Sequence, residues 1–300
     1  MKRALILLVV LAGCGGSPSQ PSQPEDETLK RETSAGDLAL TLERPEEAVA
    51  QYKAALIRAQ ERDDIAAIGD LGFNLAVAEL RADDPDAALS VARATREELE
   101  RRKQTAFPAL LLAEATALFR LGKLDEAGAM AARAQAGSDT QTSARAIFLT
   151  GLIADQRGDT DALAAAVAAL HPGNQASLKA DASELAARLA LRRGDASQAV
   201  TQAEQAAASR QEAIDYRGLA RALALAGQGA KQSGDTAAAA DFFLRSGRSA
   251  AAQHDTALAR LWLQQAVALG GHEPVGEAAQ ALLHDLDQNS ERAGDARTGS

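Results

Sequence analysis

The residue with the most distinctive chemistry in this sequence is Cys14, the only cysteine among 300 residues. One cysteine cannot form a disulfide within its own chain, so its thiol is reactive, buried or an attachment point. Lys2 and Arg3 form a basic start, the apolar run Ala4–Leu11 follows, and small residues then flank the cysteine. Such a pattern is typical of a secretory signal peptide. The apolar run is too short for a transmembrane helix, which needs about 20 residues.

Other residues that could do chemistry form no recognisable catalytic or metal-binding pattern. The histidines make no close ligand pair and have no cysteine partner, so we expect no metal; they are His171, His254, His272 and His284. The segment GQGAKQSG, residues 227–234, lacks the adjacent Gly-Lys-Ser/Thr of a phosphate loop and follows a helix instead of a strand. No G-x-S-x-G motif is present. We therefore expect no cofactor and no enzymatic activity.

The stretch Leu11-Ala12-Gly13-Cys14 resembles the lipobox of bacterial lipoproteins. The resemblance implies that residues 1–13 are removed, that the Cys14 thiol is diacylated, and that the new amino group is acylated. Several acyl chains hold a protein on a membrane where one would bind only marginally. Gly15 replaces the aspartate that retains such proteins in the inner membrane, which in a Gram-negative cell implies the outer membrane, facing the periplasm. The alternative is an ordinary secretory signal with an incidental cysteine.

The segment that follows predicts a tether. Residues 17–28, SPSQPSQPEDET, are rich in Pro, Ser and Gln and contain no large apolar side chain. Such a segment cannot bury enough surface to fold. We therefore expect residues 14–28 to form a lipidated, flexible spacer that holds the rest of the chain near the membrane.

Composition favours a helical body that does not bind nucleic acid. Hydrophobic residues make up 46% of the chain, alanine is frequent, and aromatic residues are only 3%. Alanine favours helices and is depleted in strands. The net charge of −9 is the opposite of the basic footprint that nucleic acid requires.

The body repeats one pattern of helix, short turn and helix. In the clearest unit, residues 108–135, apolar residues recur at helical spacing on both sides of Gly122. The turn glycines Gly122, Gly158 and Gly194 are 36 residues apart. Aspartate follows the last two, and Gly-Asp suits a turn because glycine tolerates the left-handed cap and aspartate caps the next helix.

These units resemble the tetratricopeptide repeat, whose period is about 34 residues. The family's small eighth residue is matched by Gly36, Ala115, Gly151 and Ala187. The alanine at its twentieth place is matched by Ala48, Ala127 and Ala199, whereas Leu163 departs from it. The fourth-place aromatic is mostly missing, and periods of 36 to 40 predict some longer helices. The resemblance implies an all-α, right-handed solenoid of stacked antiparallel helix hairpins.

We expect this repeat domain to span residues 29–288 in about seven hairpins. After residue 211 its phase is ambiguous, because turns at Gly234-Asp235 and at His254-Asp255 each define a plausible hairpin. Residues 289–300 are polar and predict a disordered tail.

In the tetratricopeptide family the first helix of each hairpin lines a concave face that binds peptides or protein segments. The matching positions here predict a groove lined by Leu112, Thr116, Phe119, Arg120, Phe148, Leu152, Asp155, Glu184, Arg188 and Arg192. The alternative is that Phe119 and Leu152 only pack against the next helix, and that the charged members are ordinary solvated residues.

These features predict a lipid-anchored periplasmic scaffold that binds a protein or peptide of the cell envelope during its assembly or that of a surface structure. One alternative is an accessory subunit of an envelope enzyme acting on peptidoglycan or sugar, although neither a second domain nor a converging pair of acids is visible. Another is a structural oligomer whose groove is filled by a second copy or by its own tail.

Overall fold

The computed structural model describes residues 26–298, with side chains up to residue 288. This range folds into fourteen α-helices and contains no strand. The helices are α1 (Glu27–Thr41), α2 (Pro45–Glu61), α3 (Ile65–Arg81), α4 (Pro85–Arg101), α5 (Pro108–Arg120), α6 (Leu124–Gln135), α7 (Thr140–Arg157), α8 (Thr160–Ala169), α9 (Ala176–Arg193), α10 (Ala196–Glu212), α11 (Tyr216–Gln232), α12 (Thr236–Ala252), α13 (Thr256–Gly270) and α14 (Pro274–Thr298).

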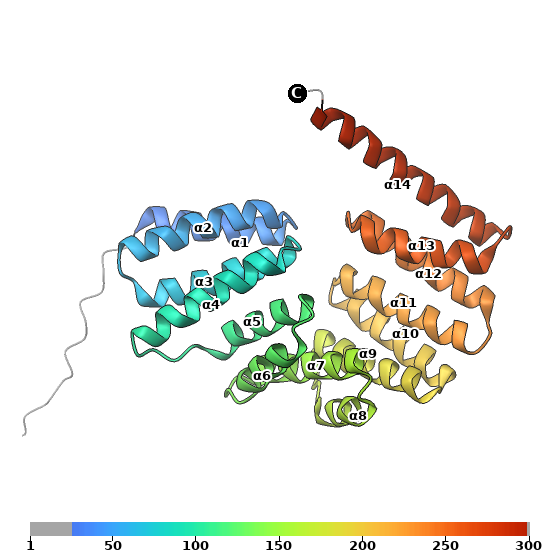
Figure 1. Ribbon diagram of the computed structural model, residues 1–300, viewed down its shortest axis with the longest axis horizontal. Coiled ribbons are helices and arrows are strands. Elements are labelled where there is room, and N and C mark those ends of the chain that lie inside the picture. The colour runs from blue at the N-terminus through green and yellow to red at the C-terminus, as the bar shows by residue number, and fades with distance from the viewer. Residues whose placement is uncertain (1–25, 299–300) are drawn as a thin grey trace, which may run out of the picture.

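Successive helices pack against each other as antiparallel hairpins, and the hairpins stack into a strongly curved array (Figure 1). The predicted all-α solenoid of helix hairpins is thus confirmed. The leader, Cys14 and most of the tether lie outside the described residues. Among the helices described, none is both long and apolar enough to cross a membrane.

In two parts of the array, successive helices have the same length and begin twenty residues apart. The helices α2, α3 and α4 have 17 residues each and begin at Pro45, Ile65 and Pro85, so each helix and its turn occupy twenty residues. The helices α10, α11 and α12 repeat this length and spacing. A hairpin of two such helices occupies forty residues, which explains the long periods in the sequence.

Aspartate side chains start nine of the described helices. Each carboxylate accepts a backbone N–H from the first turn, which satisfies a donor that has no partner within the helix. The capping residues are Asp26, Asp64, Asp84, Asp139, Asp159, Asp195, Asp215, Asp235 and Asp255. The Gly-Asp turns expected from the sequence are therefore confirmed as part of a wider pattern.

The residue before the cap has left-handed backbone geometry at many turns. Gly158, Gly194 and Gly234 have φ values of 73°, 78° and 83°, as expected for glycine at a helix end. Five other turns place a residue with a side chain there: Glu43, Asp63, Asp83, Ile214 and His254. Lys103, after α4, also has a positive φ but lies four residues before Phe107, the cap of α5. The turn at His254-Asp255 joins α12 to α13, and the one at Gly234-Asp235 joins α11 to α12. Both predicted turns therefore exist: one joins the two helices of a hairpin, and the next joins that hairpin to the following one.

Small residues let neighbouring helices approach closely, both within a hairpin and between hairpins. Ala48, Ala115, Ala127, Ala187 and Ala199 are completely buried. A Cβ atom added to Gly36 would lie 2.6 Å from the Tyr52 ring, and one added to Gly151 would lie 2.6 Å from Leu185 Cδ1. Leu163, which departs from the alanine pattern, is also completely buried.

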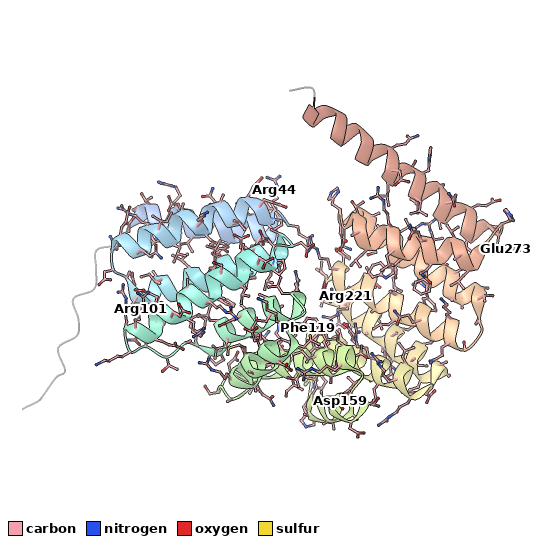
Figure 2. The ribbon with its side chains drawn as sticks, viewed as in Figure 1. Arg44, Arg101, Phe119, Asp159, Arg221 and Glu273 are labelled. Atoms are coloured by element: carbon pink, nitrogen blue, oxygen red, sulfur yellow. The ribbon has the colours of Figure 1, made fainter. Side chains whose placement is uncertain are left out.

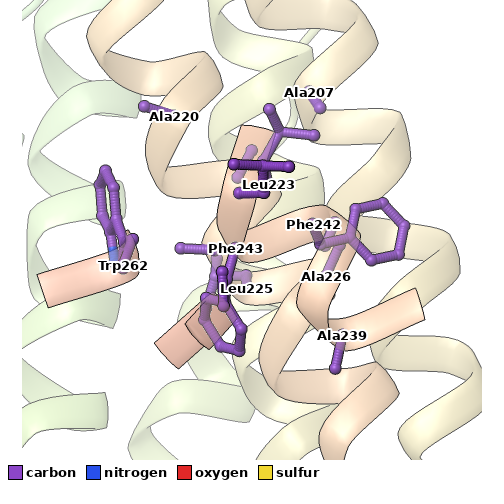
Figure 3. Close-up of a cluster of buried hydrophobic side chains, with 14 of the residues drawn as sticks. Ala207, Ala220, Leu223, Leu225, Ala226, Ala239, Phe242, Phe243 and Trp262 are labelled. Atoms are coloured by element: carbon purple, nitrogen blue, oxygen red, sulfur yellow. The ribbon is translucent and has the colours of Figure 1, made fainter. Parts of the chain in front are cut away.

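Larger side chains fill the space between hairpins. In the C-terminal half, one cluster joins α10 to α14 through many alanines and a few large residues, among them Leu223, Phe242, Phe243 and Trp262 (Figure 3). Each hairpin buries one side against the next, which is how a repeat array gains its stability.

The last helix corrects one expectation. We predicted a disordered tail from residue 289, but α14 continues to Thr298. Residues 289–298 contain no proline and include helix-forming Glu, Arg and Ala, so their polarity alone does not end the helix.

The close contact at Gly151 gives a test of the packing. Gly151→Ala should destabilise the protein by about 1–2 kcal/mol, because the new methyl group collides with Leu185 in a packed core. The matched control is Gly128→Ala in α6, where a Cβ would meet nothing within 4 Å. This control should gain about 0.5–1 kcal/mol of helix propensity. Urea unfolding followed by circular dichroism measures both, and equal shifts would contradict the proposed close contact.

Candidate functional site

The odd-numbered helices line the inner side of the curved array. Besides their hairpin partners, α3 contacts α5, α5 contacts α7, α7 contacts α9, and α9 contacts α11. Among the even-numbered helices the comparable contact is between α12 and α14. Helices on the inner side of a curve lie closer together, so from α3 to α11 the first helix of each hairpin forms the concave surface (Figure 1).

Five of the ten predicted groove residues meet on this surface, where α7 and α9 lie side by side. Asp155 on α7 accepts from two arginines of α9, Arg188 Nη1 at 3.0 Å and Arg192 Nε at 2.7 Å. The Arg192 side chain is 42% exposed, whereas that of Asp155 is 16% exposed. This part of the network can therefore meet a partner.

The network continues inward through residues that are buried. Glu184 accepts from Arg188 Nη2 at 2.9 Å and from Arg210 Nη2 at 3.0 Å. Arg210, on α10, also donates to Asp181 at 2.6 Å and to Asp215, the cap of α11, at 3.1 Å. We call these six residues of α7, α9 and α10, together with the α11 cap, the inner charge network: Asp155, Asp181, Glu184, Arg188, Arg192, Arg210 and Asp215.

The charges of the network compensate one another. Burial alone would raise the pKa of the Glu184 carboxyl, but the positive charges of Arg221, Arg188 and Arg210 outweigh it and lower the pKa. Burial raises the pKa of Asp181, although Arg210 opposes it. Since removal of a buried charge's partner is costly, the network holds α9, α10 and the start of α11 together.

Phe148 joins this network from α7. The Arg210 guanidinium lies over its ring, 5.9 Å from the ring centre, which is a cation–π arrangement. Phe148 is half-buried and packs against the core cluster of α7, α8 and α9. It therefore presents part of an apolar ring beside Arg210, two helical turns along α7 from the exposed Asp155–Arg192 pair.

The predicted groove residues of α5, and Leu152 of α7, have mainly structural contacts. Leu112, Phe119 and Leu152 are partly buried and pack against core clusters. Thr116 donates to its own helix at the Leu112 carbonyl, at 2.8 Å. Arg120 instead reaches α3, where Nη1 donates to the Leu80 carbonyl at 2.6 Å.

Glu184 was predicted to line the groove, but its side chain lies beneath the surface. The residue is 1% exposed, and two arginines occupy its oxygens. It positions Arg188 and Arg210 instead of offering its own carboxylate to a partner.

A second buried acid occurs in the N-terminal half. Glu114 on α5 is 1% exposed and accepts from Arg93 Nε at 3.2 Å and from Arg96 Nε at 2.9 Å, both on α4. Arg93 continues to Glu126 on α6. This network joins two adjacent hairpins, and its buried acid has the same role as Glu184.

Sequence reasoning missed Asp181, Arg210 and Asp215. Asp181 could have been found, because it lies three residues before Glu184 and seven before Arg188, on the same helix face. Arg210 lies on a second helix of a hairpin, where the family pattern places no groove residue.

The described residues contain no group of three or more His, Cys, Asp or Glu side chains that could hold a metal ion. The interactions of the inner charge network connect α7, α9, α10 and the start of α11.

No protein-family model and no curated protein matches the sequence. Among solved structures, the chain is similar to a tetratricopeptide repeat protein from Parabacteroides merdae, at 17% identity over 87% of this chain and 99% of that chain, with a TM-score of 0.48. It is also similar to the TPR2AB domain of yeast Sti1 in its pHSP90 complex, at 17% identity over 87% of this chain and 96% of that chain, with a TM-score of 0.36. These are likenesses of fold.

A buried arginine of the inner charge network should matter more for stability than an exposed arginine with similar contacts. Arg210→Ala should destabilise the protein by about 3–5 kcal/mol, because it leaves two buried carboxylates without their shared partner. Arg245→Ala is the matched control, since Arg245 also lies over a ring, that of Phe242, and pairs with Asp241. Its pair is exposed, so the loss should be about 1 kcal/mol or less. Similar losses in thermal unfolding would show that the network does not stabilise the fold.

Proposed function

We propose that the protein is a lipid-anchored periplasmic scaffold that holds an extended segment of another envelope protein against its inner surface. The observation that carries this proposal is the inner charge network, whose exposed end is the Asp155–Arg192 pair and whose buried Arg210 lies over the half-buried Phe148 ring. Phe148 and Asp155 are seven residues apart on α7 and so share a face of that helix. An arginine fork and an apolar ring along one helix face suit a segment that has both polar and apolar side chains.

Exposed apolar side chains elsewhere on the odd-numbered helices support the same class of partner. Leu38 on α1, Tyr216 on α11 and Leu261 on α13 are 58%, 49% and 49% exposed. Large side chains at this exposure add apolar contacts for a bound protein segment.

The anchor follows from Cys14 and from the way the array begins. The twelve residues between Cys14 and Glu27 give a spacer with a reach of roughly 20 Å if it is flexible. Asp26 fixes the end of this spacer, because it caps α1 and pairs with Arg58 at 2.8 Å and Arg62 at 3.1 Å, both at the end of α2. The first hairpin would therefore lie next to the membrane.

A pull-down from solubilised cell envelope tests the binding surface. The variant Phe148→Ala/Arg192→Ala removes the ring and the exposed guanidinium but keeps the buried acids paired, so it should fold and lose its partner. We expect recovery of the partner to fall at least about fivefold, which corresponds to about 1 kcal/mol.

The control for this pull-down changes an exposed pair on α2, Arg44→Ala/Glu47→Ala, whose ion pair is 3.5 Å long. Equal recovery by the two variants would overturn the assignment of the surface. Recovery of nothing but other copies of the chain would favour a self-associating protein instead.

The anchor has its own test. Cys14→Ser should abolish labelling by a radioactive fatty acid and release the protein from the membrane fraction, because a hydroxyl is a poor nucleophile for the lipid donor. Unchanged membrane retention of the Cys14→Ser protein would contradict the anchor and would leave the scaffold proposal intact.

A further inference from the structure

Three arginines meet on the inner surface although they come from distant parts of the chain. Arg120 ends α5, and Arg217 and Arg221 lie one helical turn apart at the start of α11. Figure 2 shows Arg221 on the inner side of the C-terminal arm, across from Phe119, the neighbour of Arg120. We call Arg120, Arg217 and Arg221 the arginine cluster.

Hydrogen bonds to one helix end bring the cluster together. Arg120 Nη1 donates to the Leu80 carbonyl at 2.6 Å, and Arg217 Nη1 donates to the Arg81 carbonyl at 3.3 Å. These are consecutive carbonyls at the end of α3, so the two guanidinium groups lie beside each other. The last carbonyls of a helix attract positive charge, which explains why arginines of α5 and α11 converge there.

The cluster carries more positive charge than its neighbours neutralise. Burial lowers the pKa of the Arg120 guanidinium, Asp83 opposes this effect, and the charges of Arg221 and Arg217 lower the pKa further. Asp83 pairs with Arg120 at 3.5 Å. Arg221 acts on Glu184 through its charge but makes no direct ion pair with any residue from 26 to 288. Three cations therefore face two nearby carboxylates, Asp83 and the buried Glu184, which two other arginines already neutralise.

We propose that the arginine cluster binds the acidic side chains of a protein segment that runs along the inner surface. This inference rests on the proposed scaffold function and gives the partner's chemistry. Arg217 is exposed and Arg221 is half-buried, so both can donate paired hydrogen bonds to a carboxylate.

The surroundings favour an acidic protein segment over a long polyanion. The whole chain has a net charge of −9, so a nucleic acid or an anionic membrane surface would be repelled by most of it. A few carboxylates on a flexible segment can enter the basic interior without that cost. The neighbouring apolar rings of Phe119 and Tyr216 also suit amino-acid side chains better than free phosphate.

The test uses a fluorescent peptide with glutamate at every second position and leucine or alanine between, and a second peptide with glutamine in place of glutamate. Binding to the lipid-free protein is measured by fluorescence anisotropy. We expect the glutamate peptide to bind, and more weakly at higher salt, and the glutamine peptide to bind poorly. Arg217→Gln and Arg221→Gln should each weaken binding of the glutamate peptide by about fivefold.

Arg248→Gln is the matched control, because Arg248 is exposed on α12, the other helix of the hairpin that carries Arg217 and Arg221. It should leave binding unchanged. Circular dichroism verifies that all variants keep their helix content.

Two results would overturn this inference. One is equal binding of both peptides, or equal loss in the Arg217→Gln, Arg221→Gln and Arg248→Gln proteins. The other is binding of phosphatidylglycerol vesicles through Arg217 and Arg221 when the peptide does not bind, which would assign the cluster to lipid.

The envelope pull-down separates this inference from the proposed function. An Arg217→Gln/Arg221→Gln protein that still captures its partner would overturn acid binding and leave the scaffold standing. Peptide binding that depends on both arginines, in a protein that captures no envelope partner, would support the cluster and contradict the scaffold.

Discussion

The close approach of paired helices is the constraint on which the rest of this structure depends. Where α1 crosses α2 and where α7 crosses its neighbours, glycine occupies the contact because a methyl group would collide. Completely buried alanines have this role elsewhere. Large side chains such as Tyr52 and Leu185 then pack directly onto these glycines. The result is a curved stack whose first helices share one concave side, and both charged sites lie on that side.

The helix boundaries could be predicted from the sequence where a turn glycine is followed directly by a capping aspartate. Gly158 and Gly194, each followed by aspartate, marked their turns correctly. The turn at Ile214 gave no such signal, because its left-handed position holds an exposed β-branched residue whose own preferences disfavour that conformation. The phase after residue 211 was ambiguous for another reason. Helices there repeat singly every twenty residues, so neither helix length nor turn spacing distinguishes the first helix of a hairpin from the second.

For the candidate site, the sequence predicts which residues share a face of one helix, but not which residues of other helices they meet. Glu184, Arg188 and Arg192 are four residues apart and so had to share a face of α9. Their partners depend on how neighbouring helices cross, which no spacing within α9 reveals. Arg210 enters from a second helix of a hairpin, and Arg217 reaches a carbonyl 136 residues earlier in the chain. The latter contact exists because the whole stack curves until α11 meets α3, a property of the accumulated geometry of several hairpins.

Burial divides the arginines of the inner surface into two roles. Arg210 is 5% exposed and meets three carboxylates, because a buried charge that lacks partners would be too costly to keep. Arg217 and Arg221 lie nearer to solvent, where water stabilises a guanidinium without a carboxylate. The fold can therefore leave them in excess. The protein as a whole is acidic and repels large anions at a distance. The arginines on its concave side attract an anion that reaches them. A flexible acidic segment carries few charges, so it can approach the protein and then bind these arginines.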